Sequence, residues 1–386
     1  MKIKKMVNKQ LAIVVGTRSD IIKLSPIIRY CEKNKVKYSL IHTGQHYNPE
    51  MDSVFFKDLN LPAPDINIRS SSSLKKNNSL DQTAVIMNKL KKVFINEKIG
   101  LVMVLGDTNS ALAASIISRR LDLKLAHVEA GLRSFDERMQ EEHNRIMIDH
   151  IADFNFAPTK TAVNHMLNEG ISREKIFLVG NTIVDAVYQN IKIAEQKSDI
   201  LRKLGIVNPL RNIVPYKFIL VTSHRPENVD HPDRLRSIIA GLDNLASKMI
   251  CEREFFALFF PIHPRTLKRM KEFNINKKDY PFINFITPPG YLDFLTLESY
   301  ASLIITDSGG IQEEACILKR PCVTIRETTE RPETLEIGCN ILAGVESQSI
   351  VNYSKKILNK KINYKNPFGD GKSADYIMKI LKKKMY

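Results

Sequence analysis

The sequence predicts an α/β protein with two Rossmann-like domains and a central cleft. Short apolar runs alternate with amphipathic helical patterns along nearly the whole chain, and this alternation begins a second time near Lys217. Repeated strand–helix units of this kind form parallel sheets with helices on both faces. The length of 386 residues also exceeds what one hydrophobic core usually serves, so two domains are expected.

Each expected strand is an apolar run that ends in a turn or a helical pattern. After the first apolar run, Leu11 to Val15, apolar side chains recur at helical spacing from Ile21 to Glu32. The strands are expected at 11–15, 38–43, 101–105, 124–129, 154–157, 176–180, 217–222, 255–261, 283–286, 302–306, 322–325 and 340–343. We expect an N-terminal domain of residues 1–180, onto which a C-terminal helix at 370–386 packs back, and a C-terminal domain of residues 181–369.

The amino-acid composition limits which kinds of molecule the protein is expected to bind and where it is expected to act. A net charge of +16 is typical either of nucleic-acid binding or of a lysine-rich surface with an anionic substrate. The lysines are dispersed and do not alternate with aromatic residues, which favours the second interpretation. The apolar runs are too short to cross a bilayer, and the N-terminal residues show no signal-peptide pattern. Five scattered cysteines without a C-x-x-C pair indicate a reduced, cytoplasmic protein.

Three separate segments each place an acid where a strand ends or a helix begins. Asp107 follows the run at 101–105, Glu129 ends the run at 124–129, and Glu141 opens a helical pattern. In an open α/β sheet the carboxyl ends of the strands face the ligand crevice. Acids gathered there beside basic residues suggest proton transfer on an anionic substrate.

Two glycine turns are candidate anion sites. The first runs from Gly16 to Asp20, with the cations Arg18 and Lys23 nearby, although it also fits an ordinary turn with Ser19 or Asp20 as the helix N-cap. In the second, Ser308-Gly309-Gly310 precedes a helix, and the N-terminus of that helix would favour a phosphate.

Polar residues around the second turn extend this candidate site. Glu313 and Glu314 could accept hydrogen bonds from ribose hydroxyls, or could only offset the helix dipole. The charged loop at 326–333 could hold a nucleotide or be a solvated turn. His224 and His263 each end an expected strand, which points to a functional position. Metal binding is not expected, because the spacing of His42 and His46 crosses Gly44 and does not lie on one helix face.

These segments together resemble the non-hydrolysing UDP-N-acetylglucosamine 2-epimerase family, in a fixed order over nearly the whole chain. The motifs that carry the resemblance are Val15-Gly-Thr-Arg, Gly44-Gln-His, Gly106-Asp-Thr, Val128-Glu-Ala-Gly-Leu-Arg, Glu141-Glu-His-Asn-Arg, Gly180-Asn-Thr, His224-Arg, Asp307-Ser-Gly-Gly-Ile-Gln-Glu-Glu and Thr328-Thr-Glu-Arg-Pro-Glu. The resemblance implies a fold like that of GT-B glycosyltransferases. It also implies an isomerase that interconverts UDP-GlcNAc and UDP-ManNAc through anti elimination of UDP, a 2-acetamidoglucal and re-addition of UDP. No cofactor or metal is implied.

The resemblance also assigns roles to individual residues. The catalytic positions are Asp107, Glu129, Glu141 and His224. The UDP-binding positions of the family match Ser308, Gly309, Gly310, Glu314 and Arg331. The leaving diphosphate needs positive charge, for which Arg18, Lys23, Arg145 and His224 are candidates, and the strand-end His263 is also expected to bind substrate. On a helix that begins at Glu141, Asn144 and Arg145 share its face. Glu142 is expected to face elsewhere.

A second nucleotide-sugar site is a weaker expectation. Many bacterial members of the family bind UDP-GlcNAc as an activator, and Gln45, His46 and Gln82 resemble that site. Asp81 stands where an arginine is common, and a negative charge there would repel an anionic activator. Allosteric activation is therefore left open.

Several alternatives remain at this stage. The chain could epimerise a modified sugar such as a UDP-2,3-diacetamido-glucuronate, hydrolyse its substrate to free ManNAc and UDP, transfer a sugar as a GT-B glycosyltransferase, or bind nucleotide sugars without turnover. The resemblance further implies a homodimer and a role in polysaccharide biosynthesis. No nucleic-acid or membrane partner is expected.

Overall fold

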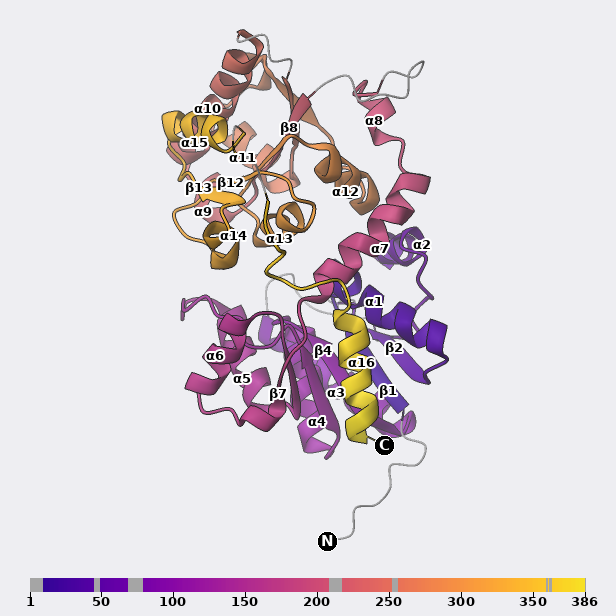
Figure 1. Ribbon diagram of the computed structural model, residues 1–386. Coiled ribbons are helices and arrows are strands. Elements are labelled where there is room, and N and C mark those ends of the chain that lie inside the picture. The colour runs from indigo at the N-terminus through magenta and orange to yellow at the C-terminus, as the bar shows by residue number, and fades with distance from the viewer. Residues whose placement is uncertain are drawn as a thin grey trace. The chain divides into compact units, whose positions relative to one another are not determined.

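The chain forms two compact units, each built on its own sheet (Figure 1). The computed structural model describes residues 10–44, 49–68, 79–207, 217–251, 256–358, 360 and 363–385. Unit 1 comprises Met1–Gln189 and Phe368–Tyr386, and unit 2 comprises Asn190–Pro367. The division falls after Gln189, whereas the sequence analysis placed it after residue 180.

In the described residues of unit 1, the strands form one parallel sheet with the order β3-β2-β1-β4-β5-β6-β7. They are β1 (Gln10–Val15), β2 (Tyr38–His42), β3 (Ile66–Asn67), β4 (Ile99–Leu105), β5 (Lys124–Val128), β6 (Phe154–Ala157) and β7 (Ile176–Leu178). The helices are α1 (Arg18–Asn34), α2 (Pro49–Asp58), α3 (Ser79–Asn96), α4 (Asn109–Arg120), α5 (Gln140–Ile151), α6 (Lys160–Asn168) and α16 (Ser373–Met385). Helix α7 (Thr182–Lys197) begins in unit 1, and its residues after Gln189 belong to unit 2.

In unit 2, the described strands form a second parallel sheet with the order β10-β9-β8-β11-β12-β13. They are β8 (Lys217–Thr222), β9 (Phe256–Pro261), β10 (Ile283–Ile286), β11 (Leu303–Thr306), β12 (Cys322–Thr324) and β13 (Asn340–Leu342). The helices are α8 (Ile200–Lys203), α9 (Pro226–Val229), α10 (Pro232–Cys251), α11 (Pro264–Glu272), α12 (Tyr291–Tyr300), α13 (Gly309–Ile317), α14 (Pro332–Glu336) and α15 (Ser347–Leu358).

The predicted fold class, two parallel α/β sheets of the Rossmann type, is confirmed. Each strand expected from the apolar runs is present within a few residues of its predicted bounds. The two-residue strand β3 was not predicted, because a pairing of that length leaves no periodic pattern. In the described residues no helix combines the length and the apolar character that a bilayer span needs.

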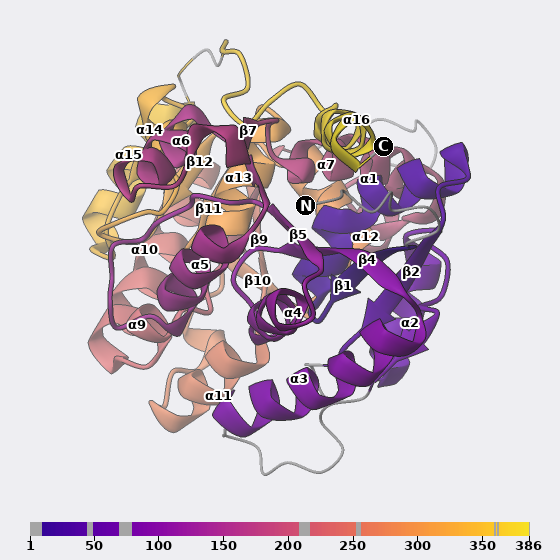
Figure 2. The same ribbon diagram turned by 90° about the horizontal axis from the view of Figure 1, so that it is seen from below.

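The sheet of unit 1 is covered by helices on both faces. Helices α3, α4 and α5 pack on one face through an apolar cluster that includes Ile86, Ile117 and Ile148. Helices α1 and α16 contact each other on the opposite face (Figure 2). The C-terminal helix thus packs within unit 1, beside the first helix of the chain.

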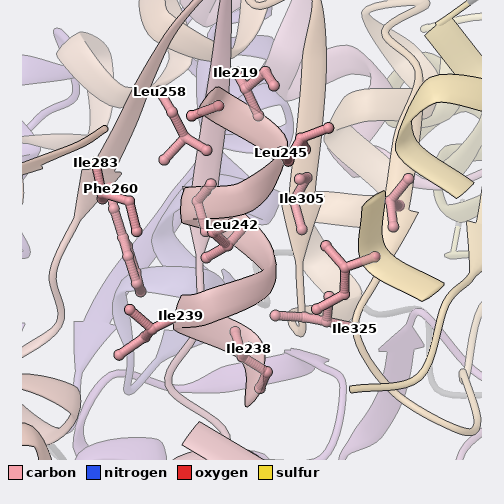
Figure 3. Packing of buried hydrophobic residues seen from close by; sticks show 14 of the residues in the cluster. Ile219, Ile238, Ile239, Leu242, Leu245, Leu258, Phe260, Ile283, Ile305 and Ile325 are labelled. Atoms are coloured by element: carbon pink, nitrogen blue, oxygen red, sulfur yellow. The ribbon is translucent and has the colours of Figure 1, made fainter. Parts of the chain in front are cut away.

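The core of unit 2 forms where α10 lies on the sheet (Figure 3). Ile238, Ile239, Leu242 and Leu245 of α10 pack against strand residues that include Leu258. Burying one such side chain contributes about 1.5–3 kcal/mol. This packing gives the strands a rigid base, from which the loops at their carboxyl ends project.

A tight backbone approach is expected to make Gly131 irreplaceable. Gly131 has a φ of +81°, and a Cβ atom there would lie 2.3 Å from the backbone oxygen of Ala162. Gly170 has a similar φ of +83°, but no atom lies within 4 Å of its Cβ position. We expect Gly131→Ala to destabilise unit 1 by about 2–5 kcal/mol, through backbone strain and the clash together.

The control for this prediction is Gly170→Ala, which introduces the same strain without the clash and should cost about 1–2 kcal/mol. Urea unfolding midpoints of both variants and the wild type provide the measurement. Equal midpoints for the two variants would contradict the packing argument.

Candidate active site

Each sheet reverses its strand order once, and the sequence-predicted residues gather at these reversals. The reversal lies between β1 and β4 in unit 1 and between β8 and β11 in unit 2. At such a switch point the loops that leave the two strands diverge, and ligands bind at their carboxyl ends. In unit 1 the residues that follow are Gly16 and Gly106-Asp107, and in unit 2 they are Ser223-His224 and Asp307-Ser308.

Glu129 is held in a strained backbone conformation directly after β5. Its φ of +68° lies in the left-handed region, which a glutamate rarely adopts. Lys23 Nζ donates to Glu129 Oε1 at 2.5 Å, and Asn181 Nδ2 lies 3.4 Å from the same oxygen. The residue is buried, with an exposed fraction of 8%. Strain of this kind persists only where the surroundings impose it, and it is concentrated at functional sites.

Asp107 is held by the first turns of α5. Arg145 Nη2 lies 2.6 Å from Asp107 Oδ2, and Asn144 Nδ2 donates to the backbone oxygen of Asp107 at 2.8 Å. One helix therefore fixes both the side chain and the main chain of Asp107. The carboxylate of Asp107 consequently has a guanidinium beside it.

Glu142 positions the arginine that contacts Asp107. Arg145 Nη1 donates to Glu142 Oε2 at 2.8 Å, and the backbone N–H groups of Ser134 and Phe135 donate to the Glu142 carboxylate at 2.9 and 3.0 Å. Burial would raise the pKa of Glu142, but these hydrogen bonds lower it below its usual value. As expected, the side chain of Glu142 faces away from that of Glu141: Glu142 is buried and Glu141 is exposed. Glu142 contacts Arg145, and Arg145 in turn contacts Asp107.

A buried ionic network lies beneath the two acids. His127 Nδ1 is 2.7 Å from Asp149 Oδ1, and His127 Nε2 is 2.8 Å from the carbonyl oxygen of Gly106. The other Asp149 oxygen accepts from Gly131 N–H at 3.0 Å and from Arg133 at 2.8 Å. Burial would raise the pKa of Asp149, but His127 and Arg133 lower it. Both ring nitrogens of His127 thus lie within hydrogen-bond distance of an oxygen atom.

Glu141 lies on the exposed side of α5. Its side chain makes no hydrogen bond or ion pair with any of the residues that the structure describes. Arg145, which was expected to share its face, instead pairs with Asp107 and Glu142. The structure therefore brings Arg145 to Asp107 without bringing it to Glu141.

The first glycine turn is a capping box. Thr17 is the N-cap of α1, so the expectation that Ser19 or Asp20 fills this position is wrong. Asp20 instead lies at the third helical position, where its Oδ2 accepts from Gly16 N–H at 2.8 Å and from Thr17 N–H at 3.0 Å. Arg18 is exposed beside this turn. Burial raises the pKa of Asp20 to about 6, although these hydrogen bonds act in the opposite direction.

The raised pKa of Asp20 predicts a pH-dependent loss of stability. Because the folded state holds the proton more tightly than the unfolded chain, stability should fall as the pH rises from about 4 to about 6 and stay constant above that. A pKa shift of this size corresponds to a change of about 3 kcal/mol in the free energy of unfolding. In Asp20→Asn, which can form similar hydrogen bonds but cannot ionise, this loss should be absent. Unfolding midpoints of both proteins at several pH values test it, and parallel pH profiles would contradict it.

In unit 2, Asp307 joins the loops that follow β8 and β11. The buried Asp307 carboxylate accepts from Ser223 Oγ at 2.9 Å, from the backbone N–H groups of His224 and Arg225 at 2.9 and 3.0 Å, and from Asn228 Nδ2 at 3.2 Å. These bonds fix the start of the His224 loop relative to the Ser308 loop. Asp307 is thus a structural anchor for two predicted site segments.

The two predicted histidines lie together. The rings of His224 and His263 are 5.3 Å apart, and His224 Nδ1 lies 3.5 Å from Asp307 Oδ1. His263 is the N-cap of α11, and its Nδ1 accepts from Arg265 N–H at 3.2 Å. Burial and then the neighbouring His224 lower the pKa of His263. A neutral His263 beside a partly exposed His224 is the expected state.

The second glycine turn forms the start of α13. Ser308 is the N-cap, but its side chain makes no capping hydrogen bond. A Cβ atom at Gly310 would lie 3.9 Å from Ser308 Oγ, and one at Gly309 would lie 3.4 Å from Glu330 Oε2, so neither position is crowded. Free N–H groups at a helix N-terminus of this kind can bind an anion such as phosphate.

Glu314 and Arg331 are positioned by neighbours within unit 2. Glu314 is nearly buried, and Tyr291 Oη donates to its Oε1 at 3.4 Å. Arg331 Nε lies 2.7 Å from Glu313 Oε1. The loop that carries Arg331 is thereby joined to the helix that begins with the two glycines.

Gln312 of α13 connects this helix to two other segments of unit 2, a role that the sequence did not indicate. Its Oε1 accepts from Thr329 Oγ1 at 2.6 Å and from Asn340 Nδ2 at 3.2 Å. These partners are 17 and 28 residues away, so no local motif could have revealed them. The same holds for Asp149, whose partner His127 is 22 residues away.

The structure describes only one of the three residues predicted for an activator site. Gln45 and His46 lie outside the described residues, and Gln82 is half-buried near the start of α3. No group of three or more His, Cys, Asp or Glu side chains in the described ranges could hold a metal ion.

Comparisons with known proteins all point to the same family of UDP-sugar 2-epimerases. The model of the UDP-N-acetylglucosamine 2-epimerase family matches residues 29–382. The UDP-N-acetylglucosamine 2-epimerase of Methanocaldococcus jannaschii is 48% identical over 378 residues, which cover 96% of this chain and 98% of the relative. The UDP-2,3-diacetamido-2,3-dideoxy-D-glucuronate 2-epimerase of Pseudomonas aeruginosa is 33% identical, with 96% and 98% coverage.

The solved structures agree with the sequence relatives. The crystal structure of the Methanocaldococcus jannaschii UDP-GlcNAc 2-epimerase, in complex with UDP-GlcNAc and UDP, superposes with a TM-score of 0.82. It covers 97% of this chain and 99% of the matched chain at 48% identity. The resemblance drawn from the sequence motifs, including the GT-B-like fold class, is thereby confirmed.

Proposed function

Because the chain belongs to the UDP-N-acetylglucosamine 2-epimerase family, we propose that it interconverts UDP-GlcNAc and UDP-ManNAc without hydrolysing them. The observation that carries this proposal is the placement of Asp107 and Glu129. They follow the adjacent strands β4 and β5, and each has a fixed cation beside it, Arg145 and Lys23. Carboxylates fixed in position in this way can serve as general acids or bases on a bound substrate.

The proposed reaction proceeds by elimination and re-addition. A base takes the proton from C2, the bond from C1 to the diphosphate oxygen breaks, and UDP leaves with the electron pair to give 2-acetamidoglucal. UDP then adds back to C1 while a proton is delivered to the opposite face of C2. Two proton-transfer groups are needed, one for each face, and Asp107, Glu129 and Glu141 are the candidates.

Unit 2 is proposed to hold the nucleotide. Ser308, Gly309 and Gly310 would bind the diphosphate at the start of α13, while Glu314 would accept hydrogen bonds from the ribose and Arg331 would contact the nucleotide. His224 and His263 would lie beside the diphosphate. Positive charge would stabilise the leaving diphosphate, and Arg18, Lys23 and Arg145 are candidates for this role.

The first test follows the C2 hydrogen. Incubation of the protein with UDP-GlcNAc in deuterated water should place deuterium at C2 and produce UDP-ManNAc, both measured by NMR. Absence of C2 exchange would contradict the proposal. Free ManNAc together with UDP would identify a hydrolysing enzyme instead.

The second test concerns the acids. Asp107→Asn, Glu129→Gln and Glu141→Gln should each lower kcat by about 10²- to 10⁴-fold, the usual contribution of a general acid or base. UDP binding should persist, since the nucleotide is proposed to bind through unit 2. Glu97→Gln, an exposed site at the end of α3, is the matched control and should leave kcat unchanged. Near-full turnover of any variant would remove that residue from the catalytic set.

A modified substrate is the second candidate. The match to the Pseudomonas aeruginosa enzyme, at 33% identity over 96% of this chain, favours testing UDP-2,3-diacetamido-2,3-dideoxy-D-glucuronate. Comparison of kcat/KM for the two nucleotide sugars decides between them. A higher value for the diacetamido sugar would overturn the choice of UDP-GlcNAc.

We also propose that the protein acts as a cytoplasmic homodimer. The four cysteines whose surroundings the structure describes, Cys31, Cys316, Cys322 and Cys339, are free thiols, which suits a reducing compartment. Light scattering coupled to gel filtration would test the dimer. Activation by a second UDP-GlcNAc at Gln45, His46 and Gln82 stays a proposal, to be tested by sigmoidal kinetics.

A further inference from the structure

His127 is a fully buried side chain that joins the strand of one candidate acid to the turn that carries the other. It lies on β5, two residues before Glu129, with an exposed fraction of 0%. Its Nε2 is 2.8 Å from the carbonyl oxygen of Gly106, the residue before Asp107. Because a carbonyl oxygen can only accept a hydrogen bond, Nε2 carries a proton and is the donor. A side chain of β5 therefore holds the main chain that follows β4.

The turn at Gly106 needs a contact from outside to fix the peptide group that follows it. Gly106 has a φ of +61°, in the left-handed region that glycine adopts without a steric penalty. Its N–H group donates to Val128 O at 3.0 Å, but this bond fixes the peptide group before the glycine. The glycine has no side chain to restrain the peptide group after it. The hydrogen bond from His127 supplies that restraint.

The peptide groups on both sides of Asp107 are held by buried side chains. His127 binds the carbonyl oxygen of the residue before Asp107, and Asn144 Nδ2 donates to the carbonyl oxygen of Asp107 itself at 2.8 Å. Together these two contacts determine the direction in which the Asp107 side chain leaves the main chain. Arg145 Nη2 then holds the carboxylate at 2.6 Å.

The same turn lies beside the second candidate acid. A Cβ atom placed on Gly106 would lie 3.6 Å from Glu129 Oε2. Glu129 follows β5 directly, so a shift of the Gly106 turn relative to β5 changes the separation of the Asp107 and Glu129 carboxylates. His127 connects these two segments close to the points where both acids are attached.

The ring of His127 is itself held from its other side. Its Nδ1 is 2.7 Å from Oδ1 of Asp149, a buried residue of α5. The second oxygen of Asp149 accepts from Gly131 N–H at 3.0 Å. The ring cannot turn without losing its contacts to Asp149 and Gly106, so it has one orientation. Its two nitrogens have different partners, and these can be removed separately.

We propose that His127 is a positioning residue, which sets the separation of Asp107 and Glu129 through its hydrogen bond to the Gly106 carbonyl oxygen. This inference rests on the proposed function, in which these two carboxylates are candidates for proton transfer at C2. A displacement of about 1 Å in a reacting group can lower a rate by about 100-fold. Loss of the hydrogen bond should therefore lower kcat. KM should change little, because the nucleotide is proposed to bind through unit 2.

Two amide variants of the full chain separate the contacts of the ring. The amide nitrogen of a glutamine can take the place of Nε2, and that of the shorter asparagine can take the place of Nδ1. His127→Gln should keep the bond to Gly106 O and lose the bond to Asp149, so kcat should persist while the urea unfolding midpoint falls. His127→Asn should keep the bond to Asp149 and lower kcat by about 10- to 100-fold with little change in KM. NMR assays of UDP-GlcNAc epimerisation give both kinetic constants.

Asn155→Ala is the matched control. Asn155 is buried on β6 opposite His127, and its Nδ2 donates to the carbonyl oxygen of Asp149 at 3.0 Å. This variant removes a buried hydrogen bond of the same kind from the neighbouring strand. It should lower the unfolding midpoint and leave kcat unchanged. A loss of kcat equal to that of His127→Asn would overturn the inference.

Crystal structures of the two His127 variants give a readout that does not depend on turnover. In His127→Asn the Gly106 carbonyl group and the Asp107 carboxylate should be displaced from their wild-type positions. In His127→Gln both should superpose on the wild type. An unmoved Asp107 in His127→Asn would overturn the inference, and so would an unchanged kcat in that variant.

A replacement variant covers the case in which His127→Gln does not fold. In Asp149→Asn the amide N–H can donate to Nδ1 while the amide oxygen still accepts from Gly131 N–H, so Nε2 still donates to Gly106 O. Its kcat should persist, and a loss as large as that of His127→Asn would overturn the inference. Absence of UDP-GlcNAc turnover in the wild type would instead contradict the proposed function, and the crystal structures would still decide whether His127 positions Asp107.

Discussion

The parallel direction of the strands is the constraint on which both units depend. Because the strands of a sheet all end at the same edge, residues far apart in the sequence, such as Asp107 and Glu129, must come together there. The same rule brings Ser223 and Asp307 together at the reversal between β8 and β11. Apolar packing below the sheet edge stabilises the fold, whereas the loops above it are free to carry chemistry.

Buried carboxylates in both units have two kinds of partner. Lys23 pairs with Glu129 and Arg133 pairs with Asp149 in unit 1, and Arg331 pairs with Glu313 in unit 2. Asp307 of unit 2 accepts instead from backbone N–H groups, as Asp20 does in unit 1. A buried ion pair resists the loss of either partner, because the remaining charge would stay without compensation. Although burial raises the pKa of Asp149, the contacts with His127 and Arg133 lower it and also hold the side chain in place.

The sequence predicted the fold more completely than the site, for physical reasons. Apolar periodicity is a local property, so β1 and the helix after it could be located within a few residues. The motif positions of Asp107 and Glu129 could be inferred because each follows a recognisable strand. The contacts of Asp149 and Gln312 could not, because their partners lie many residues away and depend on how helices pack. Glu142 was set aside from the helical face alone, which carries no information about the loop at 134–135 that it binds.

The left-handed backbone of Glu129 has a consequence for how this position can evolve. A side chain in that conformation costs about 1–2 kcal/mol relative to glycine. A glycine at position 129 would relieve this strain, but it would also remove the carboxylate that pairs with the buried Lys23 ammonium. Backbone strain and ion pairing therefore act in opposite directions on stability at this one residue. Any replacement of Glu129 changes both contributions at once.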